Sequence, residues 1–235
     1  MRGTFYFRSG LLTPVPGWGL INWMPAERSG TRLFLKGARD DFRHTGAIAP
    51  SSRFLARAIT SSIRSDAGPL RVLEAGAGTG ALTAEIVKRL PSGSTLDIYE
   101  INPVFADHLA ARFCQNGNGS AGVSIFVHNS RVQDIRLDAP YDAIVSGLPL
   151  NNFKPSQVRQ ILAKLMSALA PGGVLSWFEY LLIRELKSFT TGRRERRRLR
   201  RVGRLTGDFI EKFEFRREAI FLNLPPAVVH HLRKP

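Results

Sequence analysis

The chain alternates between two hydrophobic periods. Short apolar runs bounded by Gly, Pro or polar residues predict buried strands, and longer segments with apolar residues every three or four positions predict helices. The predicted strands are residues 71–74, 95–100, 123–127, 141–145 and 174–180, followed by a closing hairpin at 209–215 and 219–222. The predicted helices are residues 53–64, 81–90, 102–114 and 155–170, and a basic helix before the hairpin. This order predicts an α/β fold with a seven-stranded, mostly parallel sheet and one antiparallel strand.

The N-terminal region has a different pattern. Residues 1–29 are rich in Gly and Pro, so we expect little regular structure there. Residues 32–43 then have the spacing of a short amphipathic helix. Its apolar side contains Leu35, Ala38 and Phe42, and its basic side contains Arg32, Lys36, Arg39 and Arg43. Such a helix can cover the core or dock on a membrane, and the pattern favours neither. We divide the chain into an N-terminal extension, residues 1–65, and a larger domain, residues 66–235.

Composition narrows the class of protein. A chain of 235 residues, 43% of them hydrophobic, can bury one sizeable core. Its single cysteine, Cys114, excludes a disulfide within the chain and fits a reducing compartment, so we expect a cytoplasmic protein. We also expect a monomer. No apolar run reaches about 18 residues, so no spanning helix is predicted. The apolar segment after residue 11 is broken by Pro and Gly and does not resemble an export signal.

The positive charge is concentrated in one segment. The formal net charge is +15, and residues 184–204 contain ten Lys or Arg against two Glu, a net +8. More than half of the excess charge is therefore local. Such a segment needs a polyanionic partner, and the candidates are nucleic acid and an anionic membrane surface.

A glycine-rich turn, residues 74–80, follows the first predicted strand and precedes a helix. Glycines let the backbone turn sharply and let a ligand approach it closely. A dinucleotide fold needs G-x-G-x-x-G/A, which Gly76, Gly78 and Ala81 satisfy. S-adenosylmethionine enzymes instead have E/D-x-G-x-G-x-G, which Glu74 and the glycines up to Gly80 match. A carboxylate beside the turn suits a cationic amino group and sulfonium better than two phosphates, so we favour S-adenosylmethionine.

A second acid stands at the end of the second predicted strand. Glu100 comes about twenty residues after the glycine turn, where this architecture places an acid that accepts hydrogen bonds from ribose hydroxyls. The neighbouring residues Leu96, Ile98 and Ile101 indicate a buried strand end rather than a solvated acid. Glu100 is therefore the predicted ribose ligand.

The fourth predicted strand ends in a proline-containing tip, residues 146–153. In amino-methylating enzymes such a tip lies next to the methyl group, where backbone carbonyls can hold a substrate nitrogen. With the glycine turn and Glu100, the chain resembles the bacterial phospholipid N-methyltransferases, which convert phosphatidylethanolamine stepwise to phosphatidylcholine. The matching segments are residues 46–57, 74–80, 146–149 and 223–227. Ribosomal RNA adenine dimethylases are similar in layout but have an Asn-x-Pro-Tyr-type tip, which this chain lacks.

The resemblance implies a Rossmann-like class I methyltransferase with a pocket for S-adenosyl-L-methionine and no metal. The residues that it assigns to the pocket are Ser51, Ser52, Glu74, Gly76, Gly78, Gly80, Glu100, Ile101, Asn129, Ser130 and Ser146. After the third strand this family often has Gly-Asp-Ala, whereas this chain has His128-Asn129-Ser130. Adenine recognition by Asn129 is left open by this departure.

The acceptor side is also implied by the resemblance. The tip residues assigned to the acceptor amine are Ser146, Leu148 and Asn151. Tyr180, at the end of the fifth predicted strand, is our candidate for contacting the head group, because an aromatic face can hold a quaternary amine. Tyr180 can equally pack in the core with Trp177 and Phe178, and His44 is a weaker candidate base.

The expected partners follow from the same resemblance. The helix of residues 32–43 would dock on anionic lipid at the inner face of the cytoplasmic membrane, where a phospholipid would be the substrate. Another aminolipid such as ornithine lipid is an alternative acceptor. An RNA base is the rival acceptor, because the arginine-rich segment suits the phosphates of nucleic acid as well. A lipid-binding module without turnover is a third possibility.

Overall fold

The computed structural model describes residues 50–235, except residues 65, 67, 115–121, 182–191 and 224. The predicted helix of residues 32–43, the segment before it and His44 lie outside the described residues, so their roles stay predictions. The described residues belong to one compact unit that begins at Ile48.

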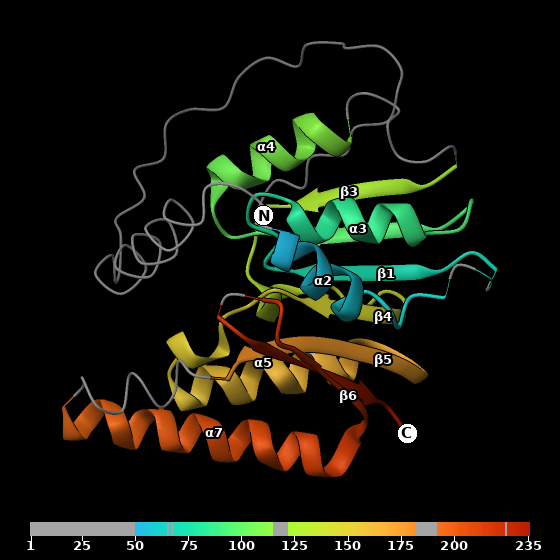
Figure 1. Ribbon diagram of the computed structural model, residues 1–235. Coiled ribbons are helices and arrows are strands. Elements are labelled where there is room, and N and C mark those ends of the chain that lie inside the picture. Colours follow the sequence, from blue (N-terminus) through green and yellow to red (C-terminus); the bar gives the residue numbers. More distant parts are fainter. Residues whose placement is uncertain (1–49, 65, 67, 115–121, 182–191, 224) are drawn as a thin grey trace, which may run out of the picture. The chain divides into compact units, whose positions relative to one another are not determined.

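Seven strands form one sheet (Figure 1). Their bounds are β1 Arg71–Ala75, β2 Thr95–Tyr99, β3 Ser124–His128, β4 Tyr141–Ser146, β5 Leu169–Tyr180, β6 Glu214–Ile220 and β7 Ala227–Arg233. The order is β3-β2-β1-β4-β5-β7-β6, and β7 runs antiparallel to both β5 and β6. The predicted Rossmann-like sheet, mostly parallel with a C-terminal antiparallel hairpin, is therefore confirmed. The strand order reverses between β1 and β4, so the carboxyl ends of these strands form the crevice where such folds bind ligands.

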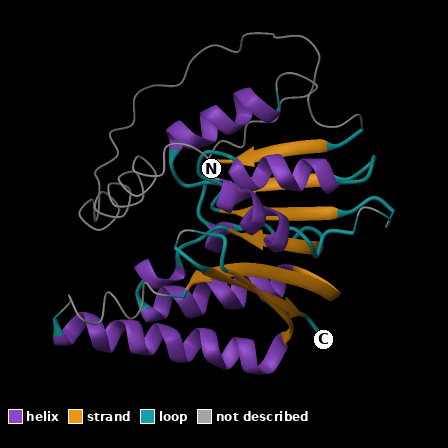
Figure 2. Ribbon diagram, in the orientation of Figure 1, coloured by secondary structure: helices purple, strands orange, loops and turns teal. Residues whose placement is uncertain are grey.

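Helices cover both faces of the sheet (Figure 2). On one face lie α2 Pro50–Ile59, α3 Ala81–Arg89 and α4 Pro103–Phe113, which pack on apolar side chains such as Val72 and Ile98. On the other lie α5 Pro155–Ala168 and α7 Arg193–Phe213, which pack on Leu73 and Ile144. Neighbouring residues of one strand enter opposite cores because side chains alternate across a strand. Two short 3₁₀ helices, η1 Val132–Asp134 and η2 Leu150–Asn152, follow β3 and β4.

The predicted closing hairpin exists but begins later than expected. Phe209 and Phe213 lie in α7 and pack against the core there, because their spacing of four residues places them on one side of a helix. The two strands are β6 and β7 instead. The expected strand positions at 209–215 and 219–222 were therefore wrong by several residues.

Helix α5 also ends earlier than the predicted residue 170, and Pro171, Gly172 and Gly173 follow soon after it. Helix α5 ends at Ala168, and these three residues lie within β5. Gly172 has φ of 75° and donates its N–H to the carbonyl of Lys234, while Gly173 accepts from Lys234. The pairing of β4 with β5 shifts register here, so the glycines form an irregularity inside a strand. At the other end, α2 begins at Pro50 rather than at residue 53 and ends at Ile59.

Within the described ranges, no helix combines the length and the apolar character needed to cross a bilayer.

Candidate active site

The glycine turn after β1 has the conformation that its sequence requires. Gly76, Gly78 and Gly80 have φ of 74°, 55° and 84°, in the left-handed region that disfavours other residues. A Cβ on Gly76 would lie 2.6 Å from Cδ2 of Leu148, so a side chain there would also collide. Gly80 is the N-cap residue of α3, so the turn passes directly into a helix N-terminus.

Glu74, the acid at the start of the motif, is fully buried beneath the turn. Its Oε2 accepts a hydrogen bond of 2.6 Å from the Thr83 hydroxyl of α3. Its Oε1 has no hydrogen-bond partner among the described residues. Burial raises the pKa of Glu74 to about 8, the charge of Glu100 acts in the same direction, and the Thr83 hydrogen bond opposes the shift. A buried carboxylate oxygen without a partner suits a cationic ligand, as S-adenosylmethionine is.

Glu100 connects the end of β2 to the glycine turn. Its Oε2 accepts from the backbone N–H of Gly78 at 2.8 Å, and its Oε1 accepts from the N–H of Asn102 at 2.8 Å. A carboxylate has about four acceptor sites, so each oxygen retains capacity for another donor. The side chain is buried and held beside the turn, as a ribose ligand must be. The two predicted acids of the cofactor motif are therefore brought together.

The end of β3 lies next to Glu100. The Asn129 side-chain Nδ2 donates to the carbonyl of Glu100 at 3.0 Å, and the Ser130 N–H donates to the carbonyl of His128 at 2.9 Å. Asn129 and Ser130, both predicted pocket residues, therefore stand at the strand end beside Glu100, the predicted ribose ligand. Ile101, also predicted, follows Glu100 directly and is 41% exposed.

His128, where this chain departs from the resembled family, has a structural partner. Its Nε2 lies 2.8 Å from Oδ1 of Asp97, and its ring stacks on Tyr99 with centroids 4.5 Å apart. Asp97 also accepts from the Tyr141 hydroxyl at 3.0 Å. Burial would raise the pKa of Asp97, but the hydrogen bonds from His128 and Tyr141 and the charge of Arg71 lower it below its usual value. His128 thus ties β3 to β2.

The tip after β4 lies directly against the glycine turn. The Gly147 N–H donates to the carbonyl of Ala75 at 2.9 Å, and a Cβ on Gly147 would lie 2.6 Å from the carbonyl oxygen of Gly76. Ser146 is buried, and its hydroxyl accepts from the N–H of Leu148 at 3.4 Å. The Leu148 side chain covers Gly76. The predicted acceptor residues Ser146 and Leu148 are thus in contact with the predicted cofactor turn.

Asn151, the third predicted acceptor residue, lies in η2. Its carbonyl is bound by a side chain that is far away in the sequence. The Arg198 guanidinium of α7 donates to the carbonyls of Asn151 at 2.7 Å and Phe153 at 2.5 Å. The charge pattern predicted a charged surface for all arginines of this segment, so this contact was not predicted from the sequence. A signal was available, because Arg198 is four residues before buried Val202 and lies on the apolar side of the helix.

Tyr180 ends β5 at the same edge of the sheet. Its ring meets that of Phe178 edge-on, with centroids 5.2 Å apart. Trp177 belongs to the core on the other face of the sheet, so packing of Tyr180 against Trp177 does not occur. The register places Tyr180 opposite Ala227, and the N–H of Leu181 donates to the carbonyl of Pro226 at 2.9 Å. The segment of residues 223–227, quoted for the resemblance, therefore lies beside Tyr180.

Exposed apolar side chains flank this edge. Ile101 and Val104 follow β2, Leu181 follows β5, and Phe221 and Leu222 follow β6. Since these strands all run in the same direction, their carboxyl ends share one edge with the glycine turn. Val104, Phe221 and Leu222 are about two thirds exposed or more, at 70%, 74% and 68%. The mouth of the site is therefore apolar on both sides.

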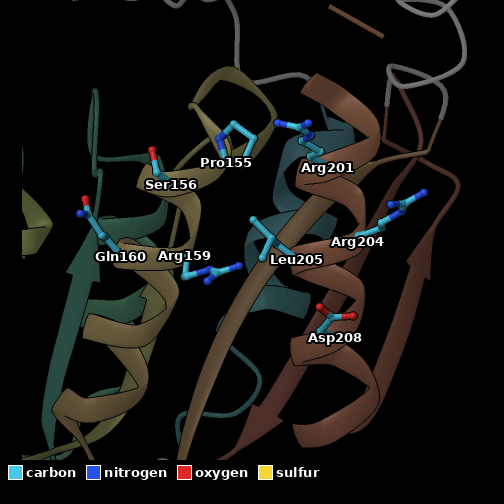
Figure 3. Close-up of a pocket in the computed structure, with 8 residues that line it drawn as sticks. All are labelled: Pro155, Ser156, Arg159, Gln160, Arg201, Arg204, Leu205 and Asp208. Atoms are coloured by element: carbon cyan, nitrogen blue, oxygen red, sulfur yellow. The ribbon is translucent and has the colours of Figure 1, made fainter. Parts of the chain in front are cut away.

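The basic helix α7 forms a groove with α5. Most of its arginines are exposed, and the groove between the two helices has a volume of about 580 Å³. It is lined by Pro155, Ser156, Arg159, Gln160, Arg201, Arg204, Leu205 and Asp208. In Figure 3, Arg159 extends from α5 toward α7, and Arg201 extends from α7 toward Pro155. This surface is strongly positive, as the charge of the segment predicts.

Two groups of predicted residues are not placed by the structure. Ser51 and Ser52 lie in the backbone of α2, but their side chains are outside the described atoms, so their cofactor contacts stay predictions. The predicted membrane-binding residues also lie outside the described part of the chain. They are Arg32, Leu35, Lys36, Arg39, Phe42 and Arg43.

Known sequences match large parts of this chain. Residues 73–175, from β1 to β5, match the family described as a methyltransferase domain. The chain is 30% identical over 138 residues to an ornithine lipid N-methyltransferase from Singulisphaera acidiphila, covering 57% of this chain and 71% of that protein. It is 25% identical over 160 residues to a 3-hydroxy-5-methyl-1-naphthoate 3-O-methyltransferase from Streptomyces sahachiroi. That alignment covers 67% of this chain and 44% of the longer relative.

Solved structures share the fold. The N-methyltransferase NodS from Bradyrhizobium japonicum WM9 superposes with a TM-score of 0.58 at 16% identity, covering 80% of this chain and 98% of NodS. A putative rRNA-methylase from Clostridium thermocellum superposes with a TM-score of 0.54 at 16% identity, covering 79% and 96% of the two chains. At these identities the likeness is one of fold alone.

Proposed function

The chain belongs to the S-adenosylmethionine-dependent methyltransferases, and we propose that it methylates the amine of an aminolipid head group at a membrane surface. The observation that carries the proposal is the apolar mouth of the site. Large apolar side chains stand exposed on both sides of the crevice, at the ends of β2, β5 and β6. Exposed apolar patches of this kind mark sites for apolar partners, and the acyl chains of a lipid are such a partner.

The residues of this chain have distinct tasks in the proposed reaction. S-adenosylmethionine supplies a methyl group on a sulfonium. The unpaired Oε1 of Glu74 and the carboxylate of Glu100 would hold its amino group and ribose beside the glycine turn. Leu148 lies over Gly76, and it would cover the β4 side of the crevice and help to exclude water from a bound methyl donor. The fit rests on the orphaned buried Oε1 of Glu74 and on the acceptor capacity that remains on the Glu100 carboxylate beside the turn.

The acceptor attacks with the lone pair of a neutral amine. The new N–C bond would form as the S–C bond breaks, with S-adenosylhomocysteine as the leaving group, and the resulting ammonium would then lose its proton to solvent. Since this is an in-line displacement, the protein contributes mainly orientation. Backbone carbonyls of the β4 tip would accept hydrogen bonds from the amine, and Tyr180 would meet the methylated product by cation–π attraction. Both roles are proposals that rest on the position of the tip and Tyr180 at one edge.

Two head groups are candidates for the acceptor. The sequences of the β4 tip and of segment 223–227 resemble the corresponding motifs of enzymes that act on phosphatidylethanolamine. The relative from Singulisphaera acidiphila is named for ornithine lipid. The two lipids share a primary amine on a flexible arm, beside an anionic phosphate or carboxylate. We therefore propose an acceptor that carries such an amine beside an anionic group. The motifs favour phosphatidylethanolamine.

The basic surface of α7 and α5 supports docking on anionic lipid. Arg159, Arg201 and Arg204 line the groove, and the part of the chain that the structure describes forms no ion pair with any of them. Each basic residue near an anionic bilayer contributes about 1 kcal/mol of binding free energy. With the predicted helix of residues 32–43, this surface would hold the protein at the inner face of the cytoplasmic membrane.

One assay tests the substrate class. The protein is incubated with radiolabelled S-adenosylmethionine and one of three acceptors: vesicles with phosphatidylethanolamine, vesicles with ornithine lipid, or total RNA. We expect label in one or both aminolipids and none in RNA. Label in RNA alone would overturn the lipid assignment in favour of an RNA methyltransferase, for which the arginine-rich surface is the favouring observation. Binding of lipid without any turnover would indicate a lipid-binding module instead.

A further inference from the structure

One arginine of the basic helix is directed inward. Most arginines of α7 are exposed, but the Arg198 side chain is only 22% exposed. It donates from Nη2 to the carbonyl of Asn151 at 2.7 Å and from Nη1 to the carbonyl of Phe153 at 2.5 Å. Hydrogen bonds from a charged donor are stronger than neutral ones, so this pair of contacts is a firm link between α7 and the loop after β4.

Glu195 fixes the orientation of that guanidinium. The Arg198 Nε donates to Oε2 of Glu195 at 2.8 Å, and Nη2 donates to Oε1 at 2.5 Å. This two-point arrangement matches the planar fork of arginine to a carboxylate and leaves the far side of the fork to the loop carbonyls. A lysine at this position would keep the charge and lose the fork.

The contacted loop joins η2 to α5. The carbonyls of Asn151 and Phe153 lie where η2 ends and just before α5 begins at Pro155, which has no N–H to offer. Inside the loop, the N–H of Asn152 donates to Pro149 and that of Phe153 donates to Leu150. Leu150 is buried, so one side of the loop is anchored in the core and the other by Arg198.

This loop continues directly from the acceptor tip. Gly147 contacts the glycine turn, Leu148 covers Gly76, and the residues held by Arg198 follow within five positions. A shift of the loop would therefore move the tip relative to the cofactor turn. Displacement of reacting groups by about 1 Å can lower a rate roughly 100-fold.

We propose that Arg198 is a positioning residue for methyl transfer, which holds the loop of residues 149–153 and through it the acceptor side of the site. The inference rests on the proposed function for its assay, but its structural part concerns the loop alone. The two faces of α7 then have different roles: the exposed arginines form the basic surface, and Arg198 positions the loop beside the site.

The test compares three variants in a micelle assay with phosphatidylethanolamine or ornithine lipid, whichever the parent methylates. Arg198→Ala should lower kcat roughly 10-fold to 100-fold, while the Kd for S-adenosylmethionine, measured by calorimetry, changes less than about twofold. Arg198→Lys should recover part of kcat, because it returns one charged nitrogen, which can donate to a loop carbonyl but lacks the fork that binds both. Lys212→Ala, which removes a charge from the exposed side of the same helix, should match the parent. Equal kcat in Arg198→Ala and Lys212→Ala would overturn the proposal.

A second measurement separates this inference from the proposed function. Hydrogen exchange followed by mass spectrometry reports the amides of residues 150–154 without any substrate. Arg198→Ala should exchange faster there, with the glycine turn unchanged, and Lys212→Ala should exchange like the parent. Unchanged exchange in Arg198→Ala would reject the link even in an active enzyme. Faster exchange together with no turnover on any lipid in the parent would support the link and reject the aminolipid proposal.

Discussion

The two halves of the site are built in different ways. The cofactor half, at the ends of β1, β2 and β3, is built on buried acids and a tight turn: Glu74 and Glu100 are buried, and the glycines of the turn have left-handed φ values. The acceptor half, at the ends of β4, β5 and β6, is open and apolar and is held partly by a distant helix. A ligand common to many enzymes can be recognised by a local motif, whereas a particular acceptor must be recognised by surfaces that several segments assemble.

The largest expected effect is a loss of docking on membranes with cofactor binding unchanged, which separates the two halves. Replacing the basic side of the predicted helix of residues 32–43 by Glu should abolish binding to anionic vesicles. Four residues at about 1 kcal/mol each correspond to about 4 kcal/mol, or roughly a 1000-fold loss. Vesicle sedimentation at increasing salt measures this loss, and calorimetry should find S-adenosylmethionine affinity unchanged. The replaced residues are Arg32, Lys36, Arg39 and Arg43.

A second variant changes the basic groove between α7 and α5 instead of the predicted helix. If the charge-reversed helix variant still sediments with anionic vesicles at physiological salt, the predicted helix is not the docking surface. Arg201→Glu with Arg204→Glu should then remove the remaining binding. Retained binding in both variants would contradict electrostatic docking altogether.

The next effect tests the cofactor half directly. Glu100→Ala removes a buried carboxylate that supports the Gly78 amide and, by the proposal, the ribose hydroxyls. Two charge-assisted hydrogen bonds at about 1.5 kcal/mol each predict about 3 kcal/mol of lost binding free energy, or roughly 100-fold in Kd. Titration calorimetry with S-adenosylmethionine measures it. Parent-like affinity would remove the ribose assignment.

A pair of glycine variants separates backbone strain from collision. Gly76→Ala combines a left-handed φ of 74° with a Cβ 2.6 Å from Leu148, and should lower the free energy of unfolding by about 2 kcal/mol or more. Gly172→Ala has the same φ, 75°, but no atom within 4 Å of the added Cβ, so only strain of about 1 kcal/mol is expected. Urea unfolding gives both values. Equal losses would show that Leu148 yields without cost.

The smallest effect is a pH dependence of cofactor binding. The raised pKa of Glu74, about 8, means that the free protein holds this carboxyl protonated near neutral pH. A cationic ligand favours the carboxylate, so affinity should rise between pH 6 and 7, by up to about 1.4 kcal/mol per pH unit, with release of a proton. Calorimetry in buffers of different ionisation enthalpy detects that proton. Glu74→Gln is the control, because the ligand's own titration persists while the protein's contribution disappears.

The same shift predicts a stability effect of defined sign. Because the folded-state pKa of Glu74 lies above its usual value of 4.5, its contribution to stability is present below pH 4.5 and is lost as pH rises toward 8. Glu74→Gln should therefore stabilise the free protein at pH 8 relative to the parent, and thermal unfolding measures the difference. A destabilised Glu74→Gln at pH 8 would mean that the carboxylate has a cationic partner already.

Local patterns in the sequence predicted most of the cofactor half. The glycine turn and Glu74 could be placed because a turn of this conformation depends on residues within a few positions of one another. Glu100 could be placed because this architecture puts an acid about twenty residues after the turn, at the end of the next strand. The hairpin was misplaced because Phe209 and Phe213 fit a strand by composition and a helix by spacing, and only contact with the core decided between them.

The sequence by itself determined the class of fold, the cofactor motif and the concentration of positive charge on one helix. Tertiary structure alone decided which arginine of that helix turns inward, which face of β5 carries Tyr180, and that apolar residues from three distant strands border one crevice. The physical reason is the distance along the chain over which each property is decided. Backbone conformation and hydrophobic period are local properties, whereas the partners of Arg198 lie 45 and 47 positions away and meet it only when α7 packs beside α5.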